Sequence, residues 1–447
     1  MARLTVATAS SLQGTLTVPG DKSISHRALF LSALAQGEGL IHGVLDSDDV
    51  RRTRDALQAM GVSMQEKGPV LKIHGKGREG FHVPDRPLDM GNSGTTTRLL
   101  LGVLAGCPFR ATLTGDGSLS QRPMRRVTQP LERMGAHFPN GADQLPLTIE
   151  GGKLHGIEYP QLVPSAQVKS AILLAGLAAN GKTTVHEFTP TRDHTERMLE
   201  FLGAKIQVLR RAVHPELLSK GERLAQDERN VIIVEPGPLQ PRELHVPGDF
   251  SSAAFFLAAA AMIPGSKITV QNVGLNPTRT SLLEVLKRME AHVETQLENG
   301  SEEWEPKGSG TVSHGQLKAV TIEPSEVPGL IDELPILMVA ATQAEGKTEI
   351  RGAGELRVKE TNRILSMVEE LSRLGAEKKI YAVRDHVFIE GPIRLRGAEV
   401  GSRGDHRTAM SLAVAGLVAE GATTVEGTEW ITISFPGFFE SLKSLGC

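Results

Sequence analysis

The sequence has few of the features that mark disulfide-rich, zinc-binding or nucleic-acid-binding proteins. Its 447 residues include only two cysteines, Cys107 and Cys447, which excludes a disulfide framework and a zinc-type cysteine spacing. Aromatic residues make up 4 % of the chain and the formal net charge is −3. Nucleic-acid binding uses aromatic stacking platforms and clustered Lys and Arg, so we expect a protein that binds no nucleic acid.

Long hydrophobic runs are also missing. The segment Met1 to Gly20 has no basic region followed by an apolar stretch, so it is unlike a signal peptide. An apolar run such as Ala253 to Ile263 is far shorter than the roughly 20 residues that a membrane helix needs. We therefore expect a soluble cytoplasmic protein that does not bind membranes.

What the chain does have is the composition of a globular protein with a large core. Hydrophobic residues make up 40 % of the sequence and charged residues 23 %. At roughly 100 to 250 residues for each domain, a chain of this length suggests two or three domains, and two is the simpler prediction.

Internal repetition is the most informative pattern. Val18-Pro-Gly-Asp21 recurs as Val246-Pro-Gly-Asp249, and an apolar helical run follows each copy. A shorter unit occurs six times, with a polar opening, an apolar helix, a glycine turn, a β-branched strand and a second amphipathic helix. The units end in Met60-Gly61-Val62, Met134-Gly135-Ala136, Leu202-Gly203-Ala204, Met289-Glu290-Ala291, Leu374-Gly375-Ala376 and Leu445-Gly446-Cys447. Three units in each half predict two similar domains with a cleft between them.

Two stretches outside these units are rich in charge or in Gly and Ser. They are Leu218 to Asn230 and Glu298 to Gln316. We expect both to be surface loops.

One segment matches the spacing of a nucleotide-binding P-loop, from Gly176 through Gly181-Lys182 to Thr183. A P-loop follows a strand and opens a helix. Here Gly176 lies in a predicted helix, and Lys182 leads into the predicted strand Thr183 to Phe188. The same turn recurs without the motif after Glu345 and Glu420, so we predict an ordinary helix-to-strand turn.

The openings of the six first helices carry the candidate site residues. The start of a helix has free N–H groups and a partial positive charge, and both favour anions. The openings begin at Asp21-Lys22-Ser23, Asn92-Ser93-Gly94-Thr95, Ser165-Ala166-Gln167, Asp249-Phe250-Ser251, Asp332-Glu333 and Asp405-His406-Arg407. In a symmetric arrangement of repeats, one cleft would gather the cations Lys22, Arg27, Arg122, Arg363 and Arg407. Arg and Lys suit carboxylates and phosphates, so we expect an enzyme for small, multiply anionic substrates.

Five segments, in chain order, resemble the signature segments of 5-enolpyruvylshikimate-3-phosphate (EPSP) synthase. They are Gly20-Asp-Lys-Ser-Ile-Ser-His-Arg27, Gly91-Asn-Ser-Gly-Thr-Thr96, Gly115-Asp-Gly-Ser-Leu-Ser-Gln-Arg-Pro-Met124, Val358-Lys-Glu-Thr-Asn-Arg363 and Gly404-Asp-His-Arg407. The resemblance covers essentially the whole chain.

The fold that this resemblance implies is α/β, with two similar domains of three βαβαββ units each. Such a domain is an inside-out α/β barrel, and the active site lies in the interdomain cleft. We expect residues 20–241 to hold repeats 1 to 3, and residues 1–19 with 242–447 to hold repeats 4 to 6. The implied two-strand hinge falls near residues 18–22 and 241–247.

The resemblance also implies a transferase of the shikimate pathway, which serves aromatic amino-acid biosynthesis. Such an enzyme transfers the enolpyruvyl group of phosphoenolpyruvate to the 5-hydroxyl of shikimate 3-phosphate, by addition followed by loss of phosphate. We expect these two small-molecule substrates, a monomer, and no metal or cofactor.

The same resemblance assigns roles to individual residues. For shikimate 3-phosphate it implies Lys22, Ser23, Arg27, Ser165, Gln167, Arg192, Asp332 and Lys359. For phosphoenolpyruvate it implies Lys22, Gly94, Arg122, Gln167, Arg363 and Arg407. Asp332 would be the general base, with Glu360 and Lys22 as candidate proton donors to carbon. The alternative for Asp332 is a helix N-cap before Leu334-Pro335.

Two other functions compete with this one. The sister enolpyruvyl transferase for UDP-N-acetylglucosamine carries a reactive Cys shortly before an Arg-Pro, whereas Gly115 to Gln121 contains none, and we expect Cys107 to be structural. A non-catalytic or RNA-end-processing βα-repeat protein is the second alternative, because fold does not fix function.

Two departures within the family concern the phosphoenolpyruvate site and the response to an inhibitor. Some members place a Lys three residues before the Pro of a C-terminal Phe-Pro, as an added contact to the phosphoenolpyruvate site. This chain has Ile433 there, so that contact must be absent or replaced. Other segments, such as Ser165 to Lys169 and Asn276 to Arg279, resemble the branch described as less sensitive to glyphosate. Gly94 nevertheless leaves room for glyphosate, so tolerance is a hypothesis.

Overall fold

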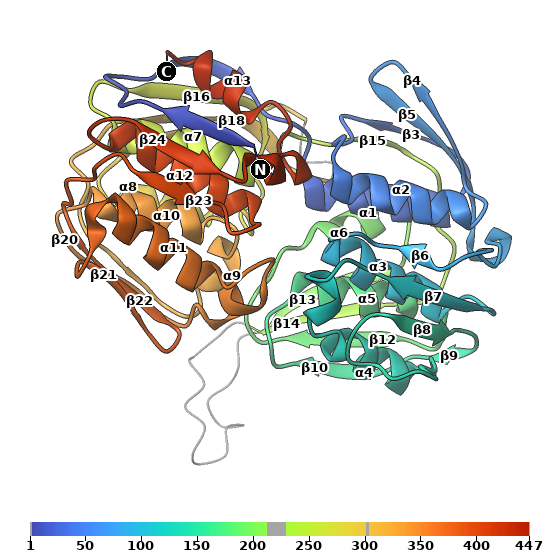
Figure 1. The fold of residues 1–447 in the computed structure, drawn as a ribbon. Coiled ribbons are helices and arrows are strands. Elements are labelled where there is room, and N and C mark those ends of the chain that lie inside the picture. Colours follow the sequence, from blue (N-terminus) through green and yellow to red (C-terminus); the bar gives the residue numbers. More distant parts are fainter. Residues whose placement is uncertain (1, 212–228, 301–303, 447) are drawn as a thin grey trace. The chain divides into compact units, whose positions relative to one another are not determined.

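A computed structural model describes residues 2–211, 229–300 and 304–446. The chain forms two compact units (Figure 1). Unit 1 contains Met1–Asp21, Leu45–Asp48 and Pro247–Cys447, and unit 2 contains Lys22–Val44 and Asp49–Val246.

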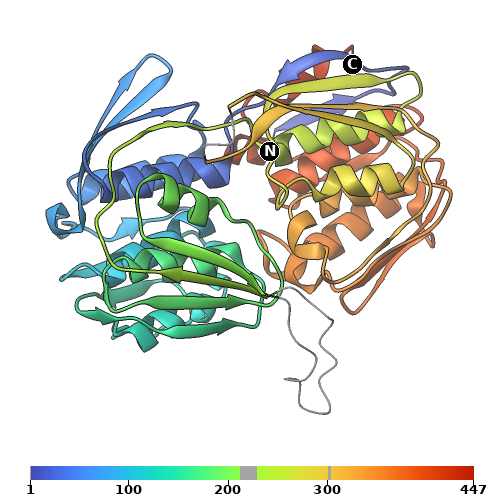
Figure 2. The same ribbon diagram turned by 180° about the vertical axis from the view of Figure 1, so that it is seen from behind.

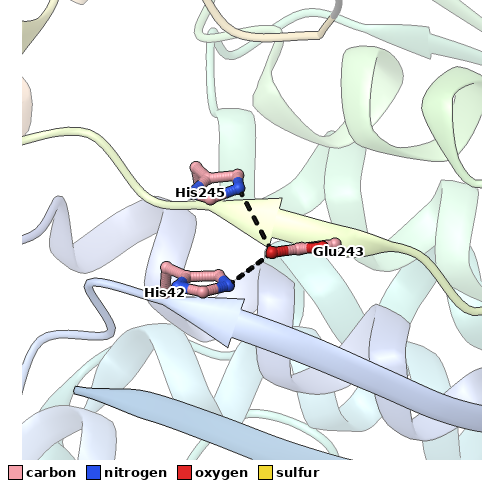
Figure 3. Close-up of side chains that lie close together, drawn as sticks. All are labelled: His42, Glu243 and His245. Atoms are coloured by element: carbon pink, nitrogen blue, oxygen red, sulfur yellow. Dashed lines mark hydrogen bonds and ion pairs between the residues drawn. The ribbon is translucent and has the colours of Figure 1, made fainter.

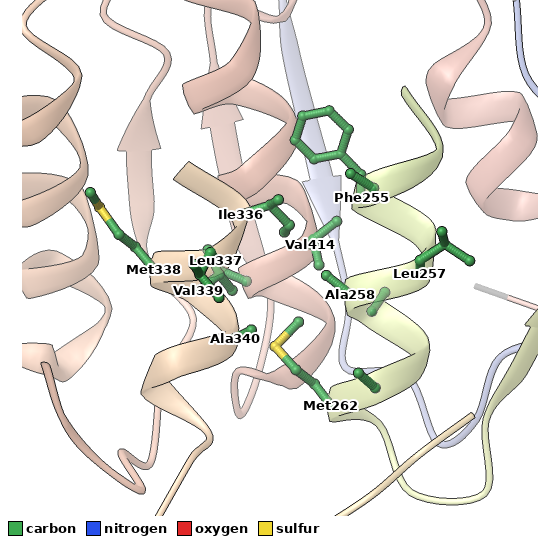
Figure 4. Close-up of a cluster of buried hydrophobic side chains, with 14 of the residues drawn as sticks. Phe255, Leu257, Ala258, Met262, Ile336, Leu337, Met338, Val339, Ala340 and Val414 are labelled. Carbon is green, nitrogen blue, oxygen red and sulfur yellow. The ribbon is translucent and has the colours of Figure 1, made fainter. Parts of the chain in front are cut away.

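Unit 1 has three buried helices at its centre: α7 (Phe250–Met262), α10 (Leu334–Thr342) and α12 (His406–Val418). Every residue of α7 and α10 is buried, as expected for helices that are apolar on all sides. Their side chains meet in one apolar cluster, where Phe255 and Ala258 of α7 lie near Ile336 of α10 and Val414 of α12 (Figure 4). The core of unit 1 is therefore helical.

Sheets and shorter helices cover this core. The second helices of the repeats are α8 (Ser281–Arg288), α11 (Arg363–Leu371) and α13 (Phe438–Lys443), and a short α9 (Val327–Leu330) precedes α10. The first sheet has the order β17 (His292–Leu297), β18 (Lys307–Ser313), β16 (Lys267–Gly274), β2 (Gln13–Thr17). The second has the order β19 (Thr321–Ile322), β20 (Gly346–Ile350), β22 (His386–Gly391), β21 (Ile380–Val383). The third has the order β1 (Arg3–Val6), β24 (Thr423–Glu426), β23 (Glu399–Gly401).

Unit 2 repeats this plan with α1 (Lys22–Leu34), α3 (Gly94–Ala105) and α5 (Ala166–Gly176) as the largely buried first helices. The second helices are α2 (Asp48–Ala59), α4 (Arg125–Met134) and α6 (His194–Phe201). One sheet has the order β15 (Glu243–His245), β3 (Gln36–His42), β5 (Val70–Lys76), β4 (Ser63–Lys67). Another has the order β10 (Glu158–Gln161), β12 (Thr183–Glu187), β14 (Arg229–Val234), β13 (Ile206–Arg211). The smaller sheets are β6 (Leu88–Asp89), β7 (Arg110–Thr114), β8 (Leu147–Glu150) and the pair β11 (Ala179–Asn180), β9 (Leu154–His155).

The strand after each first helix pairs in a recurring way. In unit 2, β3 is parallel to β15 and antiparallel to β5, and β12 is parallel to β10 and antiparallel to β14. In unit 1, β16 is parallel to β2 and antiparallel to β18. Figure 2 shows from behind how these sheets lie around the helices of each unit. The predicted class, α/β with two similar domains built from βα repeats, is confirmed.

The six predicted helix openings are also confirmed, since α1, α3, α5, α7, α10 and α12 start at or within two residues of them. The P-loop-like segment connects a helix to a strand, as expected, because α5 ends at Gly176 and β12 begins at Thr183, with the two-residue strand β11 between them. Lys182 of this segment pairs with Glu235 at 2.8 Å, on the surface.

One loop prediction is wrong. Within Glu298 to Gln316, Lys307–Ser313 forms β18, which pairs with strands on both sides. A Cβ at Gly308 would collide with the carbonyl oxygen of Gln296, so this glycine serves close strand pairing rather than a loop. Of the other predicted loop, residues 218–228 lie outside the described residues, and Asn230 belongs to β14.

In the described part of the chain, no helix has both the length and the apolar character required to cross a membrane.

Candidate active site

In unit 2, the start of α1 carries the first group of predicted site residues. Lys22 is the first residue of this helix, and its Nζ lies 3.1 Å from Oδ2 of Asp49. The hydroxyl of Ser23 accepts a hydrogen bond from Arg192 at 3.4 Å, which brings the predicted residues of α1 and of the segment before α6 together. The first turn of α1 contains no acidic residue that would offset the positive end of the helix.

Arg27, one turn further along α1, is buried and 3 % exposed. Its Nε donates to Thr195 of α6 at 2.7 Å, and one terminal nitrogen donates to Ser170 of α5 at 2.8 Å. The other terminal nitrogen donates to the carbonyl oxygen of Ser23 at 2.9 Å. Through these hydrogen bonds Arg27 joins α1, α5 and α6.

Gly94 and Arg122 lie next to each other at the start of α3. Ser93 caps this helix, because its hydroxyl accepts from the N–H of Thr96 at 3.3 Å. A Cβ at Gly94 would lie 3.2 Å from a terminal nitrogen of Arg122, so a larger residue would displace the guanidinium. Arg122 is 7 % exposed and donates to the side-chain oxygen of Asn92. The sequence assigned no role to Asn92.

Ser165 and Gln167 open α5. The hydroxyl of Ser165 accepts from the N–H of Val168 at 3.4 Å, so this residue is the helix cap. The amide of Gln167 accepts from Arg98 at 2.6 Å and donates to Thr95 at 2.9 Å, and both partners belong to α3. Arg98 was not predicted as a site residue, although it lies one helical turn after Gly94 and therefore on the same face.

A buried ion cluster supports these residues from inside unit 2. Lys169 is 1 % exposed, and its Nζ lies 2.8 Å from Glu187 and 2.7 Å from Glu196. Burial alone lowers the pKa of Lys169, but the charges of Glu196 and Glu187 raise it above its ordinary value. Burial raises the pKa of Glu196, against the opposing charge of Lys169.

This ion cluster also fixes the backbone next to Arg192. Glu187 accepts from the N–H of Thr191 at 2.9 Å and from its hydroxyl at 2.5 Å. Lys169 follows Gln167 on α5, and Glu196 follows Thr195 on α6. The cluster therefore holds the segments that carry two predicted ligands of shikimate 3-phosphate.

In unit 1, the predicted residues form a network of arginines and carboxylates. A carboxylate oxygen of Asp332 lies 3.4 Å from Arg363 and 3.4 Å from Arg407. Arg407 also donates to the carbonyl oxygen of Asp332 at 3.1 Å. Glu333, not Asp332, occupies the N-cap position of α10, and its side chain makes no capping hydrogen bond. Asp332 is therefore not the N-cap of α10.

Arg363 is the centre of this network and is 1 % exposed. It lies 2.5 Å from Glu360 and 2.7 Å from Asp405. Loss of hydration lowers the pKa of Arg363, but the charges of Asp405, Glu360 and Asp332 more than compensate and raise it. Asp405 also caps α12, since its carboxylate accepts from the N–H of Arg407 at 2.8 Å.

Lys359 lies among the same charges. Loss of hydration lowers the pKa of its ammonium to about 8, although the nearby carboxylate of Asp332 acts in the opposite direction. Lys359 is thus a cation that can exchange its proton near neutral pH.

The repeated Val-Pro-Gly-Asp segments meet within unit 1. The N–H of Asp21 donates to Pro247 and that of Asp249 to Pro19, both at 2.8 Å. Both carboxylates face the buried Arg279, at 3.7 Å for Asp21 and 3.2 Å for Asp249. Burial, reinforced by the charge of Asp21, raises the pKa of Asp249 to about 7.

Arg279 also lies near Asp332, the predicted general base. Its guanidinium lies 4.0 Å from Asp332 and 4.0 Å from Glu333. The sequence assigned no role to Arg279, although Asn276 to Arg279 was noted as a family-like segment.

Comparison with known proteins agrees with this description. The family model for EPSP synthase (3-phosphoshikimate 1-carboxyvinyltransferase) matches residues 6–442. The chain belongs to the EPSP synthase family. It is 47 % identical over 441 residues to the 3-phosphoshikimate 1-carboxyvinyltransferase of Bacillus cereus, which covers 98 % of this chain and 97 % of the relative. It is equally 47 % identical to that of Geobacillus kaustophilus, with 98 % of both chains covered.

Solved structures show the same likeness. The EPSP synthase of Acinetobacter baumannii matches with a TM-score of 0.83 and 39 % identity, over 100 % of this chain and 98 % of that one. The family and fold that the sequence motifs predicted are confirmed.

Within the described residues there is one cysteine, Cys107, and its burial agrees with membership of the EPSP synthase family. Cys107 is buried, and its thiol donates to the carbonyl oxygen of Val103 at 3.4 Å. Burial raises the pKa of this thiol to about 12, which disfavours the reactive thiolate. Cys107 therefore does not supply the reactive thiol of the sister transferase.

Proposed function

We propose that this chain catalyses the reaction of its family, with the predicted residues in the roles described below. The enolpyruvyl group of phosphoenolpyruvate passes to the 5-hydroxyl of shikimate 3-phosphate, giving 5-enolpyruvylshikimate 3-phosphate and phosphate. The observation that carries the assignment of roles is Asp332, a carboxylate 17 % exposed and held 3.4 Å from both Arg363 and Arg407.

Shikimate 3-phosphate binds mainly to unit 2 in this proposal. The hydroxyls and amide of Ser23, Ser165 and Gln167 suit its hydroxyl groups, and the positive charges of Arg27 and Arg192 suit its phosphate and carboxylate. From unit 1, Asp332 contacts the 5-hydroxyl and Lys359 adds a positive charge.

Phosphoenolpyruvate carries a phosphate and a carboxylate, and the proposed ligands are correspondingly cationic. Unit 2 contributes the side chains of Lys22, Arg122 and Gln167, and the backbone at Gly94, where no Cβ hinders a close approach. Unit 1 contributes the guanidinium groups of Arg363 and Arg407, which suit bidentate contacts with anions.

The addition step moves one proton to the base and one to carbon. Asp332 takes the proton of the 5-hydroxyl as the oxygen attacks C2 of phosphoenolpyruvate, and C3 gains a proton. Glu360 and Lys22 are the two candidate donors. Glu360 is paired with Arg363 at 2.5 Å, and a paired carboxylate must gain a proton before it can donate one.

The elimination step restores the double bond. The C2–O bond to phosphate breaks, and C3 returns a proton to the group that donated it, which gives the enol ether. The leaving phosphate takes up the proton that Asp332 accepted from the 5-hydroxyl. The cations that bind the phosphate of phosphoenolpyruvate stabilise it as a leaving group.

The test is phosphate release from phosphoenolpyruvate with two acceptors in parallel. We expect release with shikimate 3-phosphate and none with UDP-N-acetylglucosamine. Phosphate release with UDP-N-acetylglucosamine alone would contradict the proposal. Binding of short RNA at moderate salt would favour the RNA-end-processing repeat protein.

Three further proposals rest on the sequence. The first is a hinge near residues 18–22 and 241–247 between domains of residues 20–241 and of residues 1–19 with 242–447. Saturation with shikimate 3-phosphate alone should then lower the radius of gyration in small-angle scattering, because a ligand bound by both units favours a closed state.

The second proposal is a cytoplasmic monomer, and sedimentation can check the monomeric state. The third is glyphosate tolerance, and an inhibition constant as low as that of sensitive enzymes would refute it.

A further inference from the structure

Two histidines and a glutamate gather on one strand pair of unit 2, independently of the proposed function (Figure 3). His42 is the last residue of β3 and lies directly opposite His245, the last residue of the parallel strand β15. Glu243 precedes His245 by two residues, so it lies on the same face of β15. The strand register therefore brings three metal-ligand side chains to one place.

The distances among the three side chains suit a shared ion. Nε2 of His42 lies 2.7 Å from a carboxylate oxygen of Glu243, and Nε2 of His245 lies 3.6 Å from the same oxygen. One ligand atom from each of the three residues lies within 4.8 Å of the others. Two ligands of a tetrahedral zinc ion are about 3.3 Å apart, given bonds of about 2.0–2.1 Å.

Small movements are enough to reach that geometry. The two imidazole rings are stacked, with centroids 4.3 Å apart and planes inclined by 13°. The side chains of His245 and Glu243 are 57 % and 54 % exposed, so little packing opposes a change of rotamer. Across the described ranges, no other set of His, Cys, Asp or Glu side chains comes together in this way.

We propose that His42, Glu243 and His245 bind one divalent transition-metal ion of the zinc class. Neutral imidazole nitrogens and a carboxylate oxygen are ligands that zinc prefers, and three protein ligands leave a fourth position for water. The ion replaces the hydrogen bond between Nε2 of His42 and the carboxylate of Glu243, because both atoms of that bond become ligands.

The position of the site indicates its effect. The chain passes from unit 2 into unit 1 at Leu45 and at Pro247. These points lie three residues after His42 and two residues after His245. An ion bound here links the ends of β3 and β15 and so stabilises the register of this strand pair within unit 2.

The experiment is a calorimetric titration of Zn²⁺ into protein without an affinity tag. We expect one ion per chain, and binding at least about tenfold weaker in Glu243→Gln and in His245→Ala. The matched control is His137→Ala, which removes a His–Glu pair of similar length, 2.8 Å from His137 to Glu150, that has no third ligand. This control should bind Zn²⁺ as the unmodified chain does.

A second measurement separates the site from scattered surface binding. Zn²⁺ should raise the melting temperature by a few degrees when it is about 100 times its Kd, and this rise should vanish in both site variants. The proposal is overturned if the unmodified chain binds no Zn²⁺, or if both site variants bind it with unchanged affinity.

Discussion

The candidate site residues of the two units differ in what surrounds their arginines. In unit 2, Arg27 donates to hydroxyls and a carbonyl, and Arg122 donates to an amide oxygen. In unit 1, Arg363 is surrounded by three carboxylates. The three carboxylates stabilise the charged form of Arg363, and this arginine in turn holds them in place.

This difference indicates that the two units contribute differently, unit 2 mainly to anion binding and unit 1 mainly to proton transfer. The predicted ligands of unit 2 include residues at the starts of α1, α3 and α5, where the positive end of a helix favours phosphates. Unit 1 offers carboxylates kept in fixed positions by arginines, which suits proton transfer. Four substitutions test this comparison of the two units.

The largest effect is expected for Asp332→Asn. Loss of the base should lower kcat by about 10²–10⁴-fold with a small change in KM, because asparagine keeps the shape and can still contact Arg363. Steady-state kinetics measure both values, and the melting temperature checks that the variant is folded. Near-normal turnover in a folded variant would return Asp332 to a structural role.

Lys169→Met should mainly affect stability. It leaves Glu187 and Glu196 buried without their cation, which costs roughly 3–5 kcal/mol of unfolding free energy. Denaturant unfolding measures the loss, and the double variant Lys169→Met, Glu196→Gln should recover part of it. Equal stability of the single and double variants would argue against a compact ion cluster.

Arg192→Met should act on one substrate only. Removing a charged hydrogen bond of about 1.5–3 kcal/mol should raise KM for shikimate 3-phosphate by roughly 10–100-fold. KM for phosphoenolpyruvate should stay unchanged. Equal increases for both substrates would contradict the separate binding roles within unit 2.

The smallest effect concerns pH and Lys359. Its pKa of about 8 means that the ammonium is charged below pH 8 and loses its proton above it. KM for shikimate 3-phosphate should therefore rise as pH passes through 8. In Lys359→Arg, whose guanidinium stays protonated, this rise should be absent, and a rise that persists there would remove Lys359 from the binding set.

Local patterns in the sequence were enough to predict the repeats and their helix starts. Asp249 and Asp405 precede apolar runs, and both cap the helices that follow. Such signals depend on neighbours along the chain, which the sequence displays directly. The same is true of the family motifs at Lys22, Arg122 and Arg363.

The supporting contacts could not be predicted in this way. Arg98, Lys169 and Arg279 act through partners tens of residues away, and only the packing of helices reveals those pairs. The strand β18 was missed because Gly308 and Gly310 have the composition of a loop, although Gly308 packs closely against the neighbouring strand β17. The cluster of His42, Glu243 and His245 likewise arises from strand register alone.

The division of the chain between the units has a consequence for biosynthesis. Strands β1 and β2 are synthesised before unit 2, yet they pair with β24 and β16, which are made much later. Unit 2, by contrast, is complete once Val246 has emerged. Synthesis from the N-terminus therefore lets unit 2 fold first, while β1 and β2 still lack the strands with which they pair. A ribosome paused after about 280 residues, to allow for its exit tunnel, should carry a protease-resistant unit 2 and a cleavable N-terminus.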